Sequence, residues 1–311
     1  MTPVLLFLVL HLLLGAVLPL PRDPRPLFYT LLANAGSGLG RRLNRDTRPP
    51  GDLAFRGFVA VAVVTAFSAI IAYAFYRAAQ YPYGWLGGTV FLFFSASLMG
   101  PVKLLRAVTD ALAKDDTAKA VKLLQPCFPA PLSSADSHTL ARRAAEWSAV
   151  SLDVHFTAPL FWFLLLGAPG AMLSVTFAAL REAFGGHKFF GRFARLLDRL
   201  FNIVPALLTA FILMFCAIFV SGCSPRRALE TAFSQAGKYK SSGFLGLPVA
   251  AMAGALGVTL GGAEGWIGPK DSTARLSAAQ LQRCAMIHFV FFLCVTVLVS
   301  AGILLENIMV K

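Results

Sequence analysis

The sequence has few charged residues and long stretches with none. Only 14% of its 311 residues are Asp, Glu, Lys or Arg, whereas soluble domains carry about 25%. Hydrophobic residues make up 57% of the chain. This shortage of charge excludes an ordinary soluble domain and predicts an integral membrane protein.

Several motifs that carry chemistry are also missing. The sequence has no Walker loop, no H-E-x-x-H and no G-x-S-x-G. Its five cysteines include no C-x-x-C pair, so neither a zinc site nor a disulfide framework is indicated. The run Gly36-Ser-Gly-Leu-Gly40 follows no predicted strand, which makes it a weak candidate for a phosphate loop.

Acidic residues are scarce beside basic ones, 15 against 28, which gives a net charge of +13. The basic residues are scattered between apolar segments and form no single patch interleaved with aromatics, so nucleic acid is not an expected partner. Basic loops on the cytoplasmic side of an inner (plasma) membrane explain them better.

What the chain does have is a series of apolar segments. They cover residues 4–20, 58–76, 85–102, 158–180, 200–220, 244–262 and 284–305. The first lacks a basic n-region and predicts a membrane helix, with a cleaved signal peptide as the alternative. We predict an all-α, polytopic helical membrane protein with five to seven spans and interfacial amphipathic helices.

Two of these segments leave the number of spans open. Residues 158–180 contain Gly-Ala-Pro-Gly at 167–170, which predicts either one kinked span or a re-entrant hairpin. Residues 244–262 are rich in glycine, which suits close helix packing or unwound backbone near a ligand.

The polar parts of the chain predict one membrane domain over residues 1–311 with a helical insert at about 103–152. The insert predicts a helix over 103–124, a Pro-rich break, and a second helix from about Ser137. This insert and the loop 21–56 hold seven Lys or Arg each, so both are expected to face the cytoplasm.

A basic amphipathic segment lies at 187–202. On a helix its basic residues fall within an arc of about 60°, opposite its phenylalanine and leucine side chains. These basic residues are Lys188, Arg192, Arg195 and Arg199. The row would contact phosphates of membrane lipids at the surface; the alternative is that it binds an anionic substrate.

Polar residues beside membrane segments are the candidate site residues, because such groups are costly at that depth and tend to be functional. They are Glu146, Asp153, His155, Asp198, Asn202, Lys238 and Lys240. Each has an ordinary structural alternative. Glu146 can pair with Arg142, and Asp198 with Arg195, on one helix face, and His155 can be a satisfied interfacial histidine.

Three blocks of residues carry a resemblance to a known family. They are Glu146…Asp153…Ala158-Pro-Leu-Phe-Trp162, then Ala194-Arg-Leu-Leu-Asp-Arg-Leu-Phe-Asn-Ile-Val-Pro205, then Ala250-Ala-Met-Ala-Gly-Ala-Leu-Gly-Val-Thr-Leu-Gly-Gly262. They resemble the adenosylcobinamide-phosphate synthase (CobD/CbiB) family of cobalamin biosynthesis, and the last block is the most specific. The resemblance extends to Arg25–Leu32 and 111–124, so it covers nearly the whole chain.

The resemblance implies an amide-forming ligase that joins a corrinoid carboxylate to aminopropanol phosphate with ATP and magnesium. It implies catalytic roles for Glu146, Asp153 and Asp198, with Asp153 and Asp198 also as magnesium ligands. Binding of the corrinoid intermediate and the phosphorylated amino-alcohol is implied for Arg192, Arg195, Arg199, Asn202 and Ser242.

Several polar residues of the family pattern are replaced here. Its Glu-Asn pair is Val150-Ser151, its later Asn and Glu are Phe244 and Val249, and its Asp-Asp pair is Asp198-Arg199. The alternative is therefore a catalytically silent binding or regulatory membrane protein, similar to the AmpE-type inner-membrane proteins linked to β-lactamase induction. Enzyme activity is expected by resemblance only.

Overall fold

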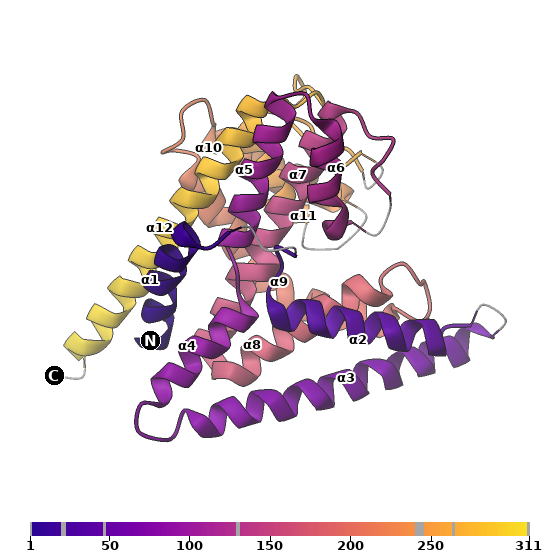
Figure 1. The fold of residues 1–311 in the computed structure, drawn as a ribbon, viewed down its shortest axis with the longest axis vertical. Helices are drawn as coiled ribbons and strands as arrows, with labels where there is room; N and C mark the ends of the chain where they lie inside the picture. Colours follow the sequence, from indigo (N-terminus) through magenta and orange to yellow (C-terminus); the bar gives the residue numbers. More distant parts are fainter. Residues whose placement is uncertain are drawn as a thin grey trace. The chain divides into compact units, whose positions relative to one another are not determined.

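The computed structural model describes residues 2–19, 23–45, 48–128, 131–239, 246–262 and 265–309. These residues fold mainly into helices, with two isolated β-bridges near 258–273 (Figure 1). In this part of the chain five helical segments are long and apolar enough to cross a membrane: Pro50–Ala78, Gly84–Ala113, Ser137–Phe184, Arg192–Cys216 and Ala278–Leu305. The predicted all-α polytopic membrane protein is confirmed.

The helices form two compact units, and the chain passes repeatedly from one to the other. Unit 1 comprises Met1–Val9, Arg25–Ser97 and Val154–Pro205. Unit 2 comprises Leu10–Pro24, Leu98–Asp153 and Ala206–Lys311. The expectation of one membrane domain with a cytoplasmic insert at 103–152 stays a prediction.

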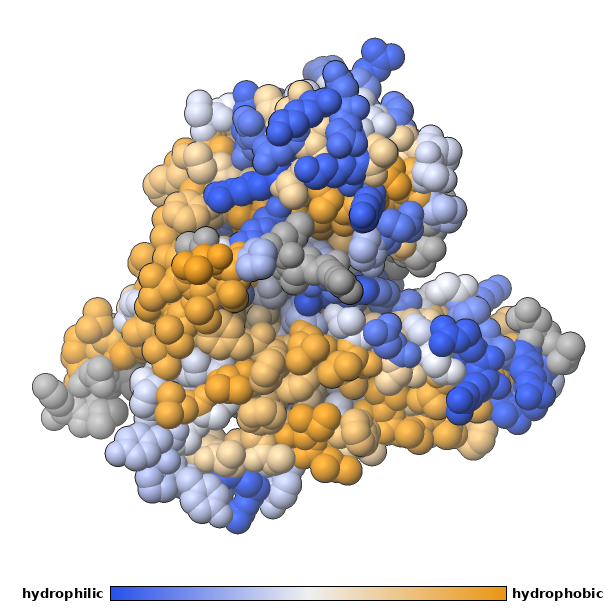
Figure 2. Space-filling model, in the orientation of Figure 1, coloured by the Kyte–Doolittle hydropathy of each residue, from blue (hydrophilic) through white to orange (hydrophobic). Residues whose placement is uncertain are grey.

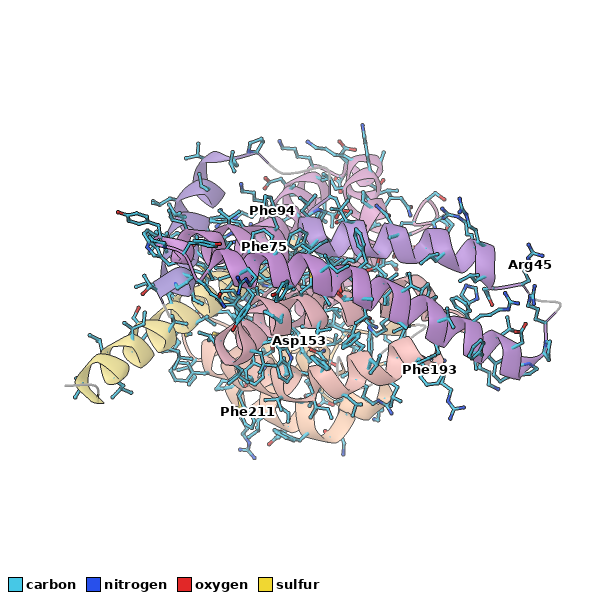
Figure 3. All side chains as sticks on the ribbon, turned by 90° about the horizontal axis from the view of Figure 1, so that it is seen from below. Arg45, Phe75, Phe94, Asp153, Phe193 and Phe211 are labelled. Atoms are coloured by element: carbon cyan, nitrogen blue, oxygen red, sulfur yellow. The ribbon has the colours of Figure 1, made fainter. Side chains whose placement is uncertain are left out.

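In unit 1, three helices pack against α8 (Ala158–Phe184): α2 (Leu27–Leu43), α3 (Pro50–Ala78) and α4 (Gly84–Ser95). Aromatic side chains fill the space between them. Phe28 of α2 lies 6.3 Å from Phe75 of α3 and 5.6 Å from Phe94 of α4, measured between ring centroids. Figure 3 labels Phe75 and Phe94, which come from these neighbouring helices.

The helix α2 lies inside the segment that the sequence predicts to be a loop, so that prediction is wrong. Three glycines between 36 and 40 lower the helix propensity of this segment. Packing reverses the preference, because a Cβ at Gly36 would lie only 2.9 Å from Leu180 of α8. Glycine thus lets the two helices approach closely, and the apolar start of α2 is buried between its neighbours.

The outward face of α3 is apolar along much of its length. Its exposed side chains include Phe55, Phe58, Val63, Phe67 and Ile70. Figure 2 shows this surface in orange, with blue at the end where α2 finishes and α3 begins. Soluble proteins rarely expose an apolar face of this extent, so lipid is the expected neighbour.

The helix α8 bends sharply at Gly167, whose φ of 67° is outside the helical region. A Cβ at Gly170 would lie 2.7 Å from the carbonyl oxygen of Trp162, although residues eight apart are separated by about 12 Å in a straight helix. The Gly-Ala-Pro-Gly run therefore bends the chain back on itself, which favours the re-entrant alternative for this segment.

The helix α9 (Arg192–Cys216) joins two elements that the sequence analysis separates. The basic amphipathic segment supplies its first turns, and the predicted span 200–220 supplies the rest. The helix continues past Pro205 without a break in its assignment. Unit 1 contains α9 as far as Pro205, and unit 2 contains the remainder.

In unit 2, α11 (Gly246–Leu256) is buried along its whole length. It packs against α7 (Ser137–Leu152), α10 (Pro225–Gln235) and α12 (Ala278–Met309). Its eleven residues extend over about 16 Å, which is too short to cross a bilayer core of about 30 Å. The glycine-rich segment is therefore a buried helix and loop.

Other predicted elements are divided. The span predicted at 85–102 is interrupted after α4, and a second helix, α5 (Met99–Ala113), follows. At its start, the ring nitrogen Nε2 of His11 accepts hydrogen bonds from the N–H groups of Leu98 and Met99, at 3.1 Å each. The helix predicted over 103–124 is split into α5 and α6 (Thr117–Leu124). The start of α7 at Ser137 is as predicted. The first helix, α1 (Thr2–Val17), is shorter than a typical span.

Candidate functional site

Glu146 of α7 is a buried carboxylate with three donors around it. Its Oε2 accepts a hydrogen bond from Arg143 Nη1 at 3.1 Å, and its Oε1 lies 3.7 Å from Nε of Arg142. Its Oε1 also accepts from the backbone N–H of Gly261 at 2.6 Å. The predicted pairing with Arg142 is confirmed. The Glu146 side chain is 2% exposed, and both carboxylate oxygens contact donor groups.

The segment that follows α11 forms a glycine loop near Glu146. Its glycines 257, 261, 262 and 265 have φ values of 66°, 103°, 58° and 114°, a conformation that favours glycine. Bridges from Val258 to Thr273 and from Leu260 to Ile267 hold the described parts of the loop together. The Arg142 guanidinium lies 4.9 Å from the ring centroid of Trp266 in this loop.

Together, Arg142, Arg143 and the glycine loop form a positively charged cluster. Backbone N–H groups in such turns make anion-binding concavities, and guanidinium groups pair well with phosphate or carboxylate. A Cβ at Gly262 would be in ordinary contact with the Arg142 guanidinium at 3.7 Å, so it is the φ of 58° that favours glycine there. Most described N–H groups of the loop already donate, that of Gly261 to Glu146 and several others to backbone carbonyl groups, so the two guanidinium groups are what this cluster can offer to an anionic group. The predicted catalytic role of Glu146 stays a prediction.

Asp153 lies in η2 (Asp153–Thr157), a single π-helical turn between α7 and α8. Such turns are frequent at functional sites. Asp153 is fully buried, and its Oδ1 accepts a hydrogen bond from Thr209 Oγ1 at 3.1 Å (Figure 3). In the same turn, the His155 ring lies edge-on to Tyr29 of α2, 4.4 Å between centroids.

Asp198 is a second buried acid, 5% exposed, near the start of α9. It pairs with Arg181 at the end of α8, with 2.9 Å between Oδ2 and Nε. The expected pairing with Arg195 is wrong. Arg195 instead donates to the carbonyl oxygens of Gly185, His187 and Lys188, because the chain that leaves α8 presents carbonyl groups that need donors.

The rest of the predicted basic face is divided between solvent and interior. Arg192 and Arg199 are exposed, Arg195 is half-buried and Asn202 is buried. Ser242 lies outside the described residues. Arg195 and Asp198 therefore have different partners in the structure. The substrate-binding roles that the resemblance implies for Arg192, Arg195, Arg199, Asn202 and Ser242 stay predictions.

A polar cluster at the junction of α2 and α8 is absent from the predicted site residues. Glu182 accepts hydrogen bonds from Arg25 at 2.5 Å and from the Tyr29 hydroxyl at 2.8 Å. Burial raises the pKa of Tyr29 well above its usual value, and the neighbouring Glu182 adds to the rise. The signal that could have found this cluster is the charged pair Arg181-Glu182 at the end of an apolar segment.

The predicted magnesium ligands were Asp153 and Asp198. Magnesium takes oxygen ligands and is commonly held by one or two carboxylates together with water and substrate phosphates. Asp198 is in an ion pair with Arg181, and Asp153 accepts a hydrogen bond from Thr209. No group of three or more His, Cys, Asp or Glu that could hold a metal ion occurs in the described part of the chain. The metal role of the two acids stays a prediction.

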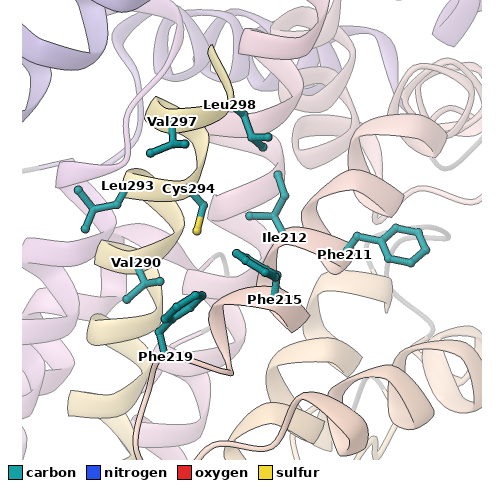
Figure 4. Close-up of a pocket in the computed structure, with 9 residues that line it drawn as sticks. All are labelled: Phe211, Ile212, Phe215, Phe219, Val290, Leu293, Cys294, Val297 and Leu298. Atoms are coloured by element: carbon teal, nitrogen blue, oxygen red, sulfur yellow. The ribbon is translucent and has the colours of Figure 1, made fainter. Parts of the chain in front are cut away.

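An apolar cavity of about 760 Å³ lies between α9 and α12 in unit 2 (Figure 4). Its lining is Phe211, Ile212, Phe215, Phe219, Val290, Leu293, Cys294, Val297 and Leu298. These side chains offer no charged group, so the cavity suits hydrocarbon and not an anionic substrate.

The helices define the class of the protein as a polytopic helical membrane protein, in which Glu146 and Asp198 form buried ion pairs with arginine. A sequence model of the family described as "CobD/Cbib protein" matches residues 6–303. The chain therefore belongs to the CobD/CbiB family of cobalamin biosynthesis proteins.

Curated relatives carry the name "Cobalamin biosynthesis protein CobD". The protein from Dehalococcoides mccartyi (strain CBDB1) is 30% identical over 211 residues, which cover 67% of each chain. The protein from Sinorhizobium sp is 28% identical over 285 residues, 86% of each chain. The protein from Stutzerimonas stutzeri (strain A1501) is 32% identical over 204 residues, 63% of this chain and 65% of the relative. No solved structure matches.

Proposed function

We propose that this protein is an adenosylcobinamide-phosphate synthase of the inner membrane. It joins a corrinoid carboxylate to the amine of aminopropanol phosphate as an amide, at the expense of ATP. The observation that carries the proposal is the family match over residues 6–303, because that range contains every predicted site residue. The relatives' names are biosynthetic, so the silent regulatory alternative is not favoured.

Amide formation requires the carboxylate oxygen to become a leaving group, and ATP would supply the phosphoryl group that achieves this. The protein's part is to bind and to stabilise charge. Arg142 and Arg143 lie beside the glycine loop, where their guanidinium groups would neutralise phosphoryl oxygens. Four glycines with positive φ shape the loop beside these arginines, a backbone conformation that L side chains disfavour.

Glu146 acts on this site through its neighbours. By accepting from Arg143 and from the Gly261 N–H, it fixes α7 against the loop. Preorganised donors stabilise a transition state without reorganisation at the moment of reaction. We therefore assign Glu146 a positioning role.

We also place the basic segments 21–56 and 103–152 on the cytoplasmic side, where ATP is available.

The experiment is complementation of a strain that lacks the cobalamin amide ligase, grown where cobalamin is required. Wild type should restore growth, and Glu146→Gln should reduce the rate of amide formation on the order of 100-fold. Glu230→Gln is the matched control, because Glu230 forms an exposed ion pair with Arg226 on α10. Failure of the wild type to complement, while present in the membrane, would overturn the proposal.

A further inference from the structure

A small polar cavity of about 290 Å³ lies in unit 1, where the end of α2 meets the end of α8. It is lined by Ser37, Gly40, Arg41, Asn44, Ala183 and His187. Ser37, Gly40 and Arg41 lie on one face of α2, because they are spaced by three or four positions, and Asn44 is the residue that caps the C-terminus of the helix. Gly40 permits the approach of α8, since a Cβ there would lie 3.4 Å from the Phe184 ring.

The polar side chains of the cavity present hydrogen-bond donors. Asn44 Nδ2 and His187 Nδ1 are 2.9 Å apart. With the amide donating, Nδ1 is the acceptor, and a neutral His187 ring carries its proton on Nε2. Ser37 adds a hydroxyl group and Arg41 adds a guanidinium group, which can donate to two oxygens of one anion at once.

The described acids of unit 1 do not balance the positive charge beside the cavity. They are Asp52, Glu182 and Asp198. Each already pairs with arginine: Asp52 with Arg48 and Arg56, Glu182 with Arg25, and Asp198 with Arg181. Among the described residues, Arg41 therefore takes part in none of the ion pairs that these acids form.

The end of α8 would normally oppose an anion, because a helix C-terminus carries a partial negative charge. Here Arg195 donates to the carbonyl oxygens of Gly185 and His187 at 2.9 and 3.0 Å, and also to that of Lys188. Its guanidinium group offsets the negative end of the helix beside the cavity. The cavity also lies at the C-terminal end of α2, whose last turn carries Arg41 and Arg42, so basic side chains offset both helix ends.

We propose that this cavity binds a phosphate group, carried either by a small soluble phosphate ester or by an anionic lipid head group. Arg41 contacts two phosphate oxygens, while Ser37 and the His187 Nε2–H donate to the others. The volume is at the lower end of ligand pockets and suits a phosphate with a short organic substituent. The proposal does not rest on the amide synthase activity, and none of the residues implied above for substrate binding lines the cavity.

The test uses the full-length protein in nanodiscs of phosphatidylcholine, titrated with inorganic phosphate by calorimetry. Wild type should bind saturably. Arg41→Gln should weaken binding at least tenfold, and His187→Ala severalfold. Arg42→Gln is the matched control. It removes the same charge from the neighbouring residue, which does not line the cavity. The phosphate affinity of this variant should stay within about twofold of wild type.

A second arm separates the two sources of phosphate. Native mass spectrometry of protein from phosphatidylglycerol nanodiscs counts the lipids that stay bound to wild type, Arg41→Gln and Arg42→Gln. Loss of one bound lipid in Arg41→Gln alone identifies a head group, whereas saturable phosphate binding lost in Arg41→Gln alone identifies a soluble ester. Equal behaviour of the two variants in both arms overturns the proposal, because it shows surface charge without a site. Monodisperse elution of each variant confirms folding.

Discussion

Glu146 and Asp198 are both buried carboxylates paired with arginine, yet they do different things in their units. Asp198 joins the start of α9 to the end of α8 through Arg181 and stays within a helix pair. Glu146 holds two arginines of its own helix and also a backbone N–H of a distant loop. The first arrangement fixes helices, whereas the second fixes a loop whose backbone and neighbouring arginines can meet a ligand.

This difference separates a structural ion pair from a site. A buried ion pair alone is weak support for function, since such pairs also occur as packing devices. A buried carboxylate that orders positive-φ glycines beside two arginines has a geometry for which packing gives no reason. The following variants test whether the distinction holds.

Glu146→Ala should have the largest effect. It leaves Arg143 and the Gly261 N–H without their acceptor and Arg142 without its ion-pair partner, which should lower the free energy of unfolding by about 3–5 kcal/mol. Thermal unfolding in detergent measures this, with Glu230→Ala as the exposed control, expected to change stability by less than about 1 kcal/mol. Equal losses of stability in the two variants would show that the contacts of Glu146 contribute no more than those of an exposed acid.

Asp198→Asn should cost less, about 1–3 kcal/mol, because asparagine keeps an oxygen acceptor for Arg181. The effect should stay in unit 1. Hydrogen exchange of residues 257–276 should match wild type, whereas Glu146→Ala should accelerate it. If Asp198→Asn also accelerated exchange in that loop, the two acids would belong to one network and the comparison would fail.

Gly261→Ala should cost about 1–3 kcal/mol through strain at a positive φ. The added Cβ would also lie 1.9 Å from the carbonyl oxygen of Gly265. Gly237→Ala is the control, because a Cβ at that glycine meets nothing within 4 Å. Amide synthase activity should fall more than stability does; preserved activity in Gly261→Ala would show that the loop geometry is dispensable.

Asp136→Ala should have the smallest effect, about 0.5–2 kcal/mol at neutral pH. Asp136 caps α7 by accepting from the Thr139 N–H at 2.9 Å, and hydrogen bonding from Thr139 lowers the pKa of its carboxyl. A lowered folded-state pKa means that the stabilisation is present above the unfolded pKa of about 3.9 and is lost as pH falls further. Denaturation at pH 7 and pH 3 should show the variant and wild type converging in acid.

Much of the fold could be predicted because apolar length and composition determine which segments enter the membrane. The errors came where packing overrode local preference. Glycines at 36, 38 and 40 lower the helix propensity of a segment that is nevertheless helical, and a Cβ at Gly36 would lie 2.9 Å from Leu180 of α8. Conversely, the apolar stretch 244–262 satisfied a composition test for a span, although among its described residues the α-helix covers Gly246–Leu256.

The site shows the same limit at the level of side chains. The Glu146–Arg142 pair could be predicted, because residues four apart share a helix face. The same rule predicted an ion pair between Arg195 and Asp198. That prediction failed because the Arg195 guanidinium donates instead to carbonyl groups of the chain after α8. The contact from Glu146 to Gly261 depends on the tertiary fold, and no local spacing rule applies to it.

Neither unit is a continuous stretch of chain, and this has a consequence for how the protein is made. Unit 1 has all of its residues once Pro205 has left the ribosome, whereas unit 2 begins with Leu10–Pro24 and is complete only after α12. Glu146 is therefore synthesised 115 residues before Gly261, its partner in the finished fold. During that interval the carboxylate has only the arginines of its own helix to pair with, so the loop contact is among the last that the chain can form.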